Sequence, residues 1–384
     1  MRQRINSGII GTEQVISIAS GGGFNSIHDA YVKTRANKWP SRAFQGGNQS
    51  AADVYTLAEQ MVTAQNMATP VVGGSLTLNA VSLGNYEYVV KQGNQTISAF
   101  TAADWFSGTA DTYASFCVIN GNLTINSGQT FIPQVRKLFT VLFVNGNLTV
   151  NGAISMTARG ANHSGLGNSG GSTTAGAILI KTGTYSGITN PVIPAAGASG
   201  GAGSGGTGPA ATGGGSGGGG GGGRSGRNGG AAGTSFSGGS GGGGDHDGGN
   251  SPAPTPNGGK GGDGSAVNGT TSNAGGAGNP GGTGIYAGAA NGGDGTGGTL
   301  IVICTGTLSG AGAITSLGSA GGDGGSSNSY GVGGGGSGGG SVTVMFGTDS
   351  STITPSAAGG SGGGGKSNSG GAGGAGTARK LSLA

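Results

Sequence analysis

The sequence is poor in charged and aromatic side chains. Only 8% of its 384 residues are Asp, Glu, Lys or Arg, and 5% are Phe, Trp or Tyr. Soluble proteins average about 25% charged residues, so this is not the composition of an ordinary globular enzyme. The two cysteines, Cys117 and Cys304, are too few and too far apart to form a disulfide framework or a zinc site. We expect both to pack as small buried apolar groups.

Other absences in the sequence argue against membrane insertion, nucleic-acid binding and secretion through a signal peptide. There is no run of roughly 18 apolar residues, so we expect no membrane insertion. The net charge is only +4, and Lys and Arg are scattered rather than arranged in the stripe that a phosphate backbone requires. We therefore expect no nucleic-acid binding. The basic start of the chain lacks the apolar stretch of a secretory signal.

Glycine dominates what is present, and it is distributed unevenly. Of the 99 Gly residues, residues 1–150 hold 15 and residues 151–384 hold the other 84. The last Glu is Glu87 and the last Trp is Trp105. We place a domain boundary before the repeats described below. This predicts a docking domain over 1–115 and a glycine-rich domain over 116–384.

The N-terminal part has conventional signals. Ser50 with Asp53 resembles a capping box, and apolar residues then follow at helical spacing, which predicts a helix near 51–67. The segments SLTLNAVSL (75–83) and YEYVVKQG (86–93) are short, apolar and bounded by Gly or Asn, so we expect strands there.

An internal repeat begins at residue 116. FCVINGNLTINSG (116–128) aligns without gaps on VLFVNGNLTVNGA (141–153), and the latter aligns on IVICTGTLSGAGA (301–313). Looser copies are ILIKTGTYSG (178–187) and VTVMFGT (342–348). Each copy is an apolar strand, a pivot glycine and a second strand. The pivots are Gly121, Gly146, Gly183, Gly306 and Gly347.

Such units cannot bury their apolar side chains alone, but stacked units build a continuous narrow core. We expect the five pivots to occupy equivalent corners of stacked β rungs. One interior column should contain Leu123, Leu148, Tyr185 and Leu308.

The longest insertion between rungs, 196–298, contains almost no Leu, Ile or Val and cannot form a hydrophobic core. One interpretation is a flexible Gly/Ser linker. The other is an ordered array of extended, left-handed helices with three residues per turn, which Gly permits because backbones without Cβ atoms can approach closely. The flanking strands return to the same repeat and so fix the ends of the insertion, which favours the ordered array.

Chemistry-bearing residues are sparse in this half. The carboxylates are not paired as a glycosidase requires, so we expect no catalytic site, and we expect no cofactor. The densest polar cluster, Asp245 to Asp247, is flanked by Gly and its side chains alternate, so we expect a solvated loop tip and no metal site. Three GGDG sequences place Asp263, Asp294 and Asp323 where we expect them to accept hydrogen bonds from nearby backbone N–H groups. The larger side chains that interrupt Gly are typical of binding anchors. These receptor-binding candidates are Arg224, Arg227, Phe236, Asp245, His246, Asp247, Tyr286 and Tyr330.

The arrangement resembles the glycine-rich tail-fibre adhesins of T-even-type bacteriophages. The segments that carry the resemblance are FVNGNLTVNGAISMTARGANHSG (143–165), LIVICTGTLSGAGAITSLGSAGGDGG (300–325) and GGGSGGGGGGGRSGRNGG (213–230). The resemblance implies an N-terminal α+β attachment domain that docks on another tail-fibre or virion structural protein. It also implies a lattice of polyglycine-II-type helices whose loops bind an outer-membrane protein or a surface glycan.

Three functions compete. The first is a virion adhesin at a tail-fibre tip, made in the host cytoplasm without a signal peptide. The second is a structural fibre, matrix or virion subunit without receptor binding, and the third is a polysaccharide-degrading spike. The inserted segments differ from one another, as in SPAPTPNGGK and GGGGDHDGGN, which favours recognition. We therefore predict a non-enzymatic adhesin with a mainly β fold and a polyglycine-II-type array, in which stacked β rungs carry inserted Gly-rich left-handed helices.

Overall fold

The structure is a computed structural model that describes residues 44–108, 113–160, 178–193, 293, 295–323, 333–365 and 369–383, and the backbone of 265–266 and 270–271. The chain divides into two units, Met1–Ala43 and Phe44–Ala384, and every described residue lies in the second. Within the described residues the fold is mainly β, with one α-helix.

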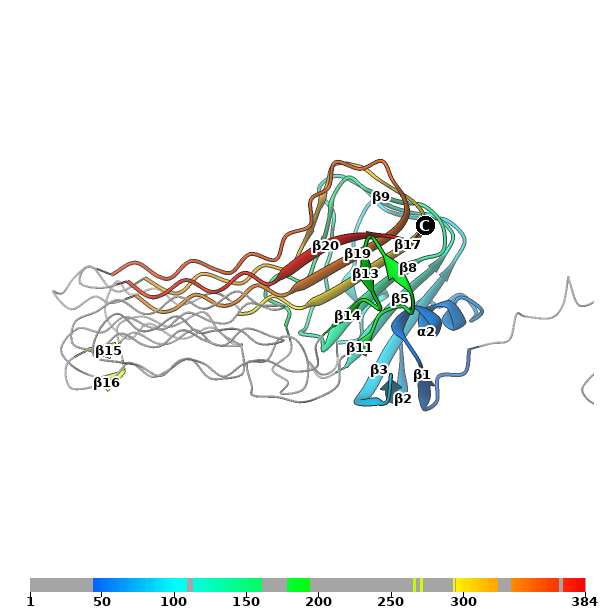
Figure 1. Cartoon of the computed structure of the whole chain (residues 1–384), viewed down its shortest axis with the longest axis horizontal. Helices are drawn as coiled ribbons and strands as arrows, with labels where there is room; N and C mark the ends of the chain where they lie inside the picture. Colours follow the sequence, from blue (N-terminus) through cyan, green and yellow to red (C-terminus); the bar gives the residue numbers. More distant parts are fainter. Residues whose placement is uncertain are drawn as a thin grey trace, which may run out of the picture. The chain divides into compact units, whose positions relative to one another are not determined.

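The second unit is built from stacked rungs. In each rung the chain runs along a first face, turns at a glycine, and continues along a second face (Figure 1). The first face consists of parallel neighbours in the order β3 (Val81–Gln92), β5 (Ala114–Asn120), β8 (Phe139–Val144), β17 (Thr299–Ser309), β19 (Ser341–Asp349) and β20 (Thr377–Ser382).

The other two faces continue the same stack. The second face comprises β4 (Gln95–Ile97), β6 (Leu123–Ile125), β9 (Leu148–Val150) and the C-terminal ends of β17 and β19. The third comprises β7 (Thr130–Phe131), β10 (Ala153–Ser155), β18 (Ala313–Thr315) and a bridge from Thr315 to Ser356. The prediction of stacked β rungs is therefore confirmed.

Four of the five pivot glycines lie at equivalent corners. A Cβ atom on Gly146 would lie 2.6 Å from the carbonyl oxygen of Gly121, and one on Gly306 would lie 2.8 Å from that of Gly146. A Cβ on Gly347 would lie 2.9 Å from the carbonyl oxygen of Gly306. Successive rungs approach so closely at this corner that only Gly fits without displacing the neighbouring backbone.

The interior column is confirmed for three residues. Leu123 pairs with Leu148, Leu148 pairs with Leu308, and all three are fully buried. The prediction is wrong for Tyr185 and for the corner role of Gly183, because residues 178–193 form an antiparallel ribbon instead of a rung. The ribbon pairs β11 (Ile178–Leu179) with β14 (Val192–Ile193) and β12 (Thr184–Tyr185) with β13 (Ile188–Thr189).

Asparagine ladders flank the glycine corner and explain the NGN sequence of the repeat. The side-chain oxygen of Asn122 accepts from the backbone N–H of Asn147 at 2.8 Å, and that of Asn147 accepts from Thr307 N at 2.9 Å. On the other side of the glycine, Asn145 Nδ2 donates to Asn120 Oδ1 at 2.9 Å. These bonds tie each rung to the next where the strands are interrupted.

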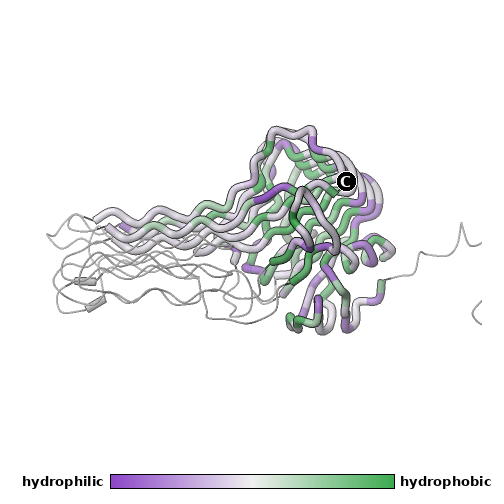
Figure 2. The backbone as a smooth tube through the Cα atoms, viewed as in Figure 1, coloured by the Kyte–Doolittle hydropathy of each residue, from purple (hydrophilic) through white to green (hydrophobic). Residues whose placement is uncertain are grey.

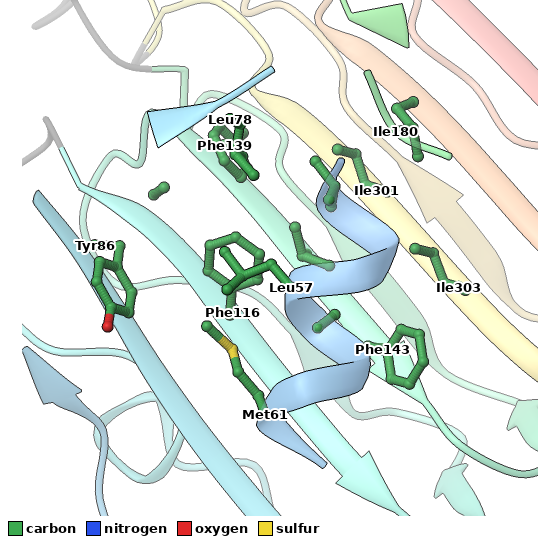
Figure 3. Close-up of a cluster of buried hydrophobic side chains, with 14 of the residues drawn as sticks. Leu57, Met61, Leu78, Tyr86, Phe116, Phe139, Phe143, Ile180, Ile301 and Ile303 are labelled. Carbon is green, nitrogen blue, oxygen red and sulfur yellow. The ribbon is translucent and has the colours of Figure 1, made fainter. Parts of the chain in front are cut away.

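Two hydrophobic cores lie on opposite sides of the first face. The inner core fills the space between the faces. At the β7 end the Trp105 ring packs edge-on against Phe131 and the Phe106 ring packs against it at a tilt, with 5.2 Å between ring centroids in both pairs. These two residues follow the 3₁₀ turn η1 (Ala102–Asp104). The outer core lies under the helix α2 (Val54–Met61) (Figure 3). Because both sides are buried, the strands of this face read as continuous apolar runs.

Helix α2 is confirmed but shorter than the predicted 51–67. Asp53 caps it, accepting from Thr56 N at 2.6 Å. At the other end, Gln92 Nε2 donates to the carbonyls of Val62 and Ala64, which satisfies acceptors that a longer helix would have bonded internally.

The remaining strands complete the N-terminal side. β1 (Gln49–Ala51) pairs with β2 (Val71–Leu78), and β2 forms a hairpin with β3 through Asn79 and Ala80, which both have positive φ. The segment 75–83, predicted as one strand, contains this turn and is divided between β2 and β3, whereas the strand predicted at 86–93 lies in β3 up to Gln92. A separate short pair joins β15 (Ser265–Ala266) and β16 (Thr270–Thr271). The boundary expected between residues 115 and 116 falls inside β5, which pairs with β3 over seven residues.

Candidate functional site

All eight receptor-binding candidates lie outside the described residues. They are Arg224, Arg227, Phe236, Asp245, His246, Asp247, Tyr286 and Tyr330. The structure does describe glycine-rich segments on either side of these stretches in the sequence. Segments 295–298, 333–340 and 369–376 lead directly into β17, β19 and β20, and Figure 1 shows them extending from the N-terminal ends of these strands.

These segments are hydrogen-bonded to one another with a period of three residues. The donors advance in steps of three, and so do the acceptors. In one antiparallel pair of segments, the N–H groups of Gly334, Ser337 and Gly340 donate to the carbonyls of Gly322, Ser319 and Ser316. In another, Gly370, Gly373 and Gly376 donate to Gly363, Gly360 and Ala357. A β-strand would repeat every two residues.

The segment 333–340 has more neighbours than a strand can have. Its N–H groups donate to segments 316–322 and 371–374, its carbonyls accept from segment 357–363, and Gly338 also accepts from Gly297 N. A strand bonds to two neighbours in one plane. All eight residues of this segment are buried, although seven are Gly and one is Ser, so the segment buries polar backbone and not apolar side chains.

Close approach accounts for the glycine content. A Cβ atom at Gly339 would lie 1.9 Å from the carbonyl oxygen of Ala357, and one at Gly376 would lie 1.7 Å from that of Gly340. A Cβ at Gly373 would lie 2.0 Å from the carbonyl oxygen of Ser337. Distances this short between Cβ and backbone leave no room for any side chain.

Burial follows the same three-residue repeat in the outer segments. Gly360 and Gly363 are buried whereas Ala358 and Ser361 are exposed. From 369 onward the exposed positions are Ser369, Ala372 and Ala375. Except for the buried Ala357, the Ala and Ser side chains of these segments occupy the one position in three that faces outward. Figure 2 shows the corresponding change from apolar strands to nearly neutral segments.

Of the three GGDG aspartates, Asp323 alone is described. Its Oδ1 accepts from the backbone N–H of Gly364 at 2.6 Å. The predicted bond to backbone N–H is confirmed, but its partner is 41 residues away on a neighbouring segment and not in the same turn. Asp263 and Asp294 lie outside the described part. In the described residues, no group of three or more His, Cys, Asp or Glu side chains could hold a metal ion.

A second cluster of chemistry-bearing side chains lies inside the rung stack. Glu87 on β3 and Lys137 just before β8 are both completely buried, and Lys137 Nζ lies 2.8 Å from Glu87 Oε1. Ser107 donates to Glu87 Oε2 through its backbone N–H at 3.2 Å and also through its hydroxyl. No sequence pattern indicated this cluster, because the two charged residues are 50 positions apart in the chain and only the strand register brings them together.

Burial disfavours ionisation of both cysteine thiols. Burial raises the pKa of Cys304 to about 11 and raises the pKa of Cys117 well above the ordinary thiol range. Both cysteines are buried and unpaired with each other, as the sequence predicted. At the last rungs, Lys380 forms a partly exposed ion pair with Asp349.

No protein-family model, no curated protein and no solved structure matches the chain. Among the described residues there is no helix of the length and apolarity needed to cross a bilayer.

Proposed function

We propose that the protein is a bacteriophage adhesin at a tail-fibre tip that binds a bacterial surface receptor through loops of a glycine-rich lattice. The observation that carries the proposal is the three-residue hydrogen-bond period between glycine-rich segments. A flexible linker would have no such period, so the segments act as a scaffold.

We infer that this scaffold is a polyglycine-II-type array. Such a helix has three residues per turn and no internal hydrogen bonds, so its N–H and C=O groups point outward to neighbours in several directions. The bonds from segment 333–340 to its neighbours fit this geometry. The exposure of every third residue in 357–365 and 369–376 fits it as well.

A lattice of this kind offers little for recognition, because Gly presents only backbone. Recognition then falls to the loops that connect successive segments, where the chain can vary without disturbing the packing. Tyr330 lies between Asp323 and Gly333, which end two neighbouring segments, and the other candidates lie between residues 194 and 292. Arg and Tyr are typical anchors, and Arg pairs bidentately with carboxylates.

Docking on another virion protein is assigned to residues 1–115. Residues 44–108 also build α2 and the first rung, so within this region the docking surface shares its elements with the rung stack. The alternatives remain a structural subunit without receptor binding and a polysaccharide-degrading spike.

The test uses the full chain and intact cells of candidate hosts. One variant carries Phe236→Ser, Tyr286→Ser and Tyr330→Ser together with Gly/Ser replacement of 224–227 and 245–247. We expect it to lose cell binding and keep its melting temperature. The matched control replaces three exposed apolar residues elsewhere, Val71→Ser, Val72→Ser and Ile188→Ser, and should bind like the wild type.

Two outcomes would contradict the proposal. Undiminished binding by the loop variant would move the receptor site elsewhere, and absence of wild-type binding to every host of the phage that encodes the chain would favour a structural subunit. Release of reducing sugar from host polysaccharide would favour the spike.

A further inference from the structure

The buried cluster of Glu87, Lys137 and Ser107 is arranged for a reaction between its own side chains. Two opposite charges with 0% exposure have left water entirely, which is costly even for a pair. The contact between Nζ and Oε1 is short at 2.8 Å, yet Oε1 receives no hydrogen bond of acceptable geometry. The amine therefore touches the carboxyl group without being aligned as an ordinary donor.

Ser107 contacts both reacting groups. Its backbone N–H and its hydroxyl both donate to Oε2 of Glu87, and its carbonyl oxygen accepts from Lys137 Nζ at 3.1 Å. Two donors converging on one carboxyl oxygen are the arrangement that stabilises an oxyanion during acyl transfer. The carbonyl contact holds the amine beside the other oxygen.

We propose that Lys137 and Glu87 condense into an intramolecular amide bond. A proton moves from Nζ to Oε1, which leaves a neutral amine beside a neutral carboxylic acid. The amine nitrogen attacks Cδ, and the charge that develops on Oε2 is held by the two Ser107 donors. A second proton passes from the nitrogen to Oε1, the Cδ–Oε1 bond breaks, and Oε1 leaves as water. No oxidant, reductant or further reactant is required.

The surroundings favour the product. A neutral amide removes two buried charges from an apolar interior. The strand register places Ser115 and then Thr140 beside Glu87 on the neighbouring strands. Both hydroxyls are buried and have no hydrogen-bond partner within the described part of the chain. These two groups provide polar contacts for the water that leaves.

The bond would tie β3 to the start of β8 across β5. It would close a loop of 50 residues between positions 87 and 137 and so restrict the unfolded chain, as a disulfide does. This cross-link does not depend on what the protein binds.

Peptide mapping of the purified full chain tests the proposal. Trypsin cleaves after a free lysine but not after an amide-linked one. We expect a branched peptide that joins residues 43–91 to 137–159 and weighs one water molecule less than the two parts. The denatured intact chain should show the same loss.

Three variants sharpen the test. Lys137→Arg keeps the positive charge but cannot condense, so the branched peptide and the mass loss should vanish. Ser107→Ala removes one oxyanion donor and should slow formation on the order of 100-fold in a freshly refolded sample. Lys91→Arg is the matched control, because Lys91 donates to the carbonyls of Met67 and Ala68, and it should leave the cross-link intact.

A folded wild-type chain that keeps its full mass, and yields separate peptides cleaved after Lys137 even after prolonged incubation, would overturn the proposal. This result does not require any variant to fold.

Discussion

At the corner of each rung, the space available to one residue is set by the carbonyl group of the rung beside it. A Cβ on Gly146 would meet Gly121 O at 2.6 Å and Asn122 Oδ1 at 2.8 Å. The carbonyl cannot withdraw freely, because the side-chain oxygen of Asn122 bonds the next rung through Asn147 N. Glycine at this position is therefore required by contact between rungs.

Gly146→Val should destabilise the protein by about 1–3 kcal/mol or more, because overpacking displaces backbone that is already hydrogen-bonded. The measurement is urea unfolding of the full chain. Gly47→Val is the control, since a Cβ there meets nothing within 4 Å. Equal midpoints for the two variants would mean that the rungs do not approach at this corner.

At the scale of elements, the chain alternates between two kinds of segment with different periods. Strands such as β17 and β19 repeat every two residues and bury apolar side chains on both sides. The glycine-rich segments repeat every three residues and bury backbone. The strands fix the position and direction of each glycine-rich segment, which offsets part of the large entropy lost when Gly is ordered.

Replacing adjacent residues of one segment tests the period of three. Gly373→Val should lower the melting temperature by several degrees, because its Cβ would lie 2.0 Å from Ser337 O. Ala372→Val should change it little, because residue 372 is exposed. Thermal melts followed by circular dichroism compare the two, and similar melting temperatures would argue against a packed array.

The rungs could be predicted from the sequence where the residues that make the contacts between rungs recur at the same spacing. Gly146 and Leu148 recur as Gly306 and Leu308 because the corner and the interior column impose the same requirement on each rung. Residues 178–187 imitate this pattern but turn back at Ser186, which has positive φ, so pairing became antiparallel. No local pattern indicated that Glu87 and Lys137 meet, because their contact depends on the order of β3, β5 and β8.

In the second unit the composition changes near residue 115, but the β-sheet continues across that position. The shift toward glycine indicated a boundary near residue 115, but that position lies inside β5, which is paired with β3 in one sheet. Helix α2 shares one hydrophobic cluster with residues from both sides of that position, Leu78 and Tyr86 before it and Phe116 and Phe143 after it (Figure 3). The early residues therefore serve as the cover and first rung of the stack that carries the glycine-rich segments.

A truncation series distinguishes one continuous unit that begins near residue 44 from an independent glycine-rich domain over 116–384. A fragment of residues 44–384 should melt cooperatively within a few degrees of the full chain, because it retains the whole second unit. A fragment of 116–384 should fail to do so. It loses α2, whose Val54, Leu57 and Met61 are completely buried. Each such side chain contributes about 1.5–3 kcal/mol, and a domain's net stability is only about 5–15 kcal/mol.

The shorter fragment also loses Trp105 and Phe106, which close the inner core over Phe131. Exposed apolar surface on both sides of the first face should make it aggregate, and size-exclusion chromatography with a thermal melt would detect this. A monomeric 116–384 fragment with the melting temperature of the full chain would instead establish an independent glycine-rich domain. Cell binding is therefore best measured with the 44–384 fragment, in which the rungs that hold the glycine-rich segments remain covered.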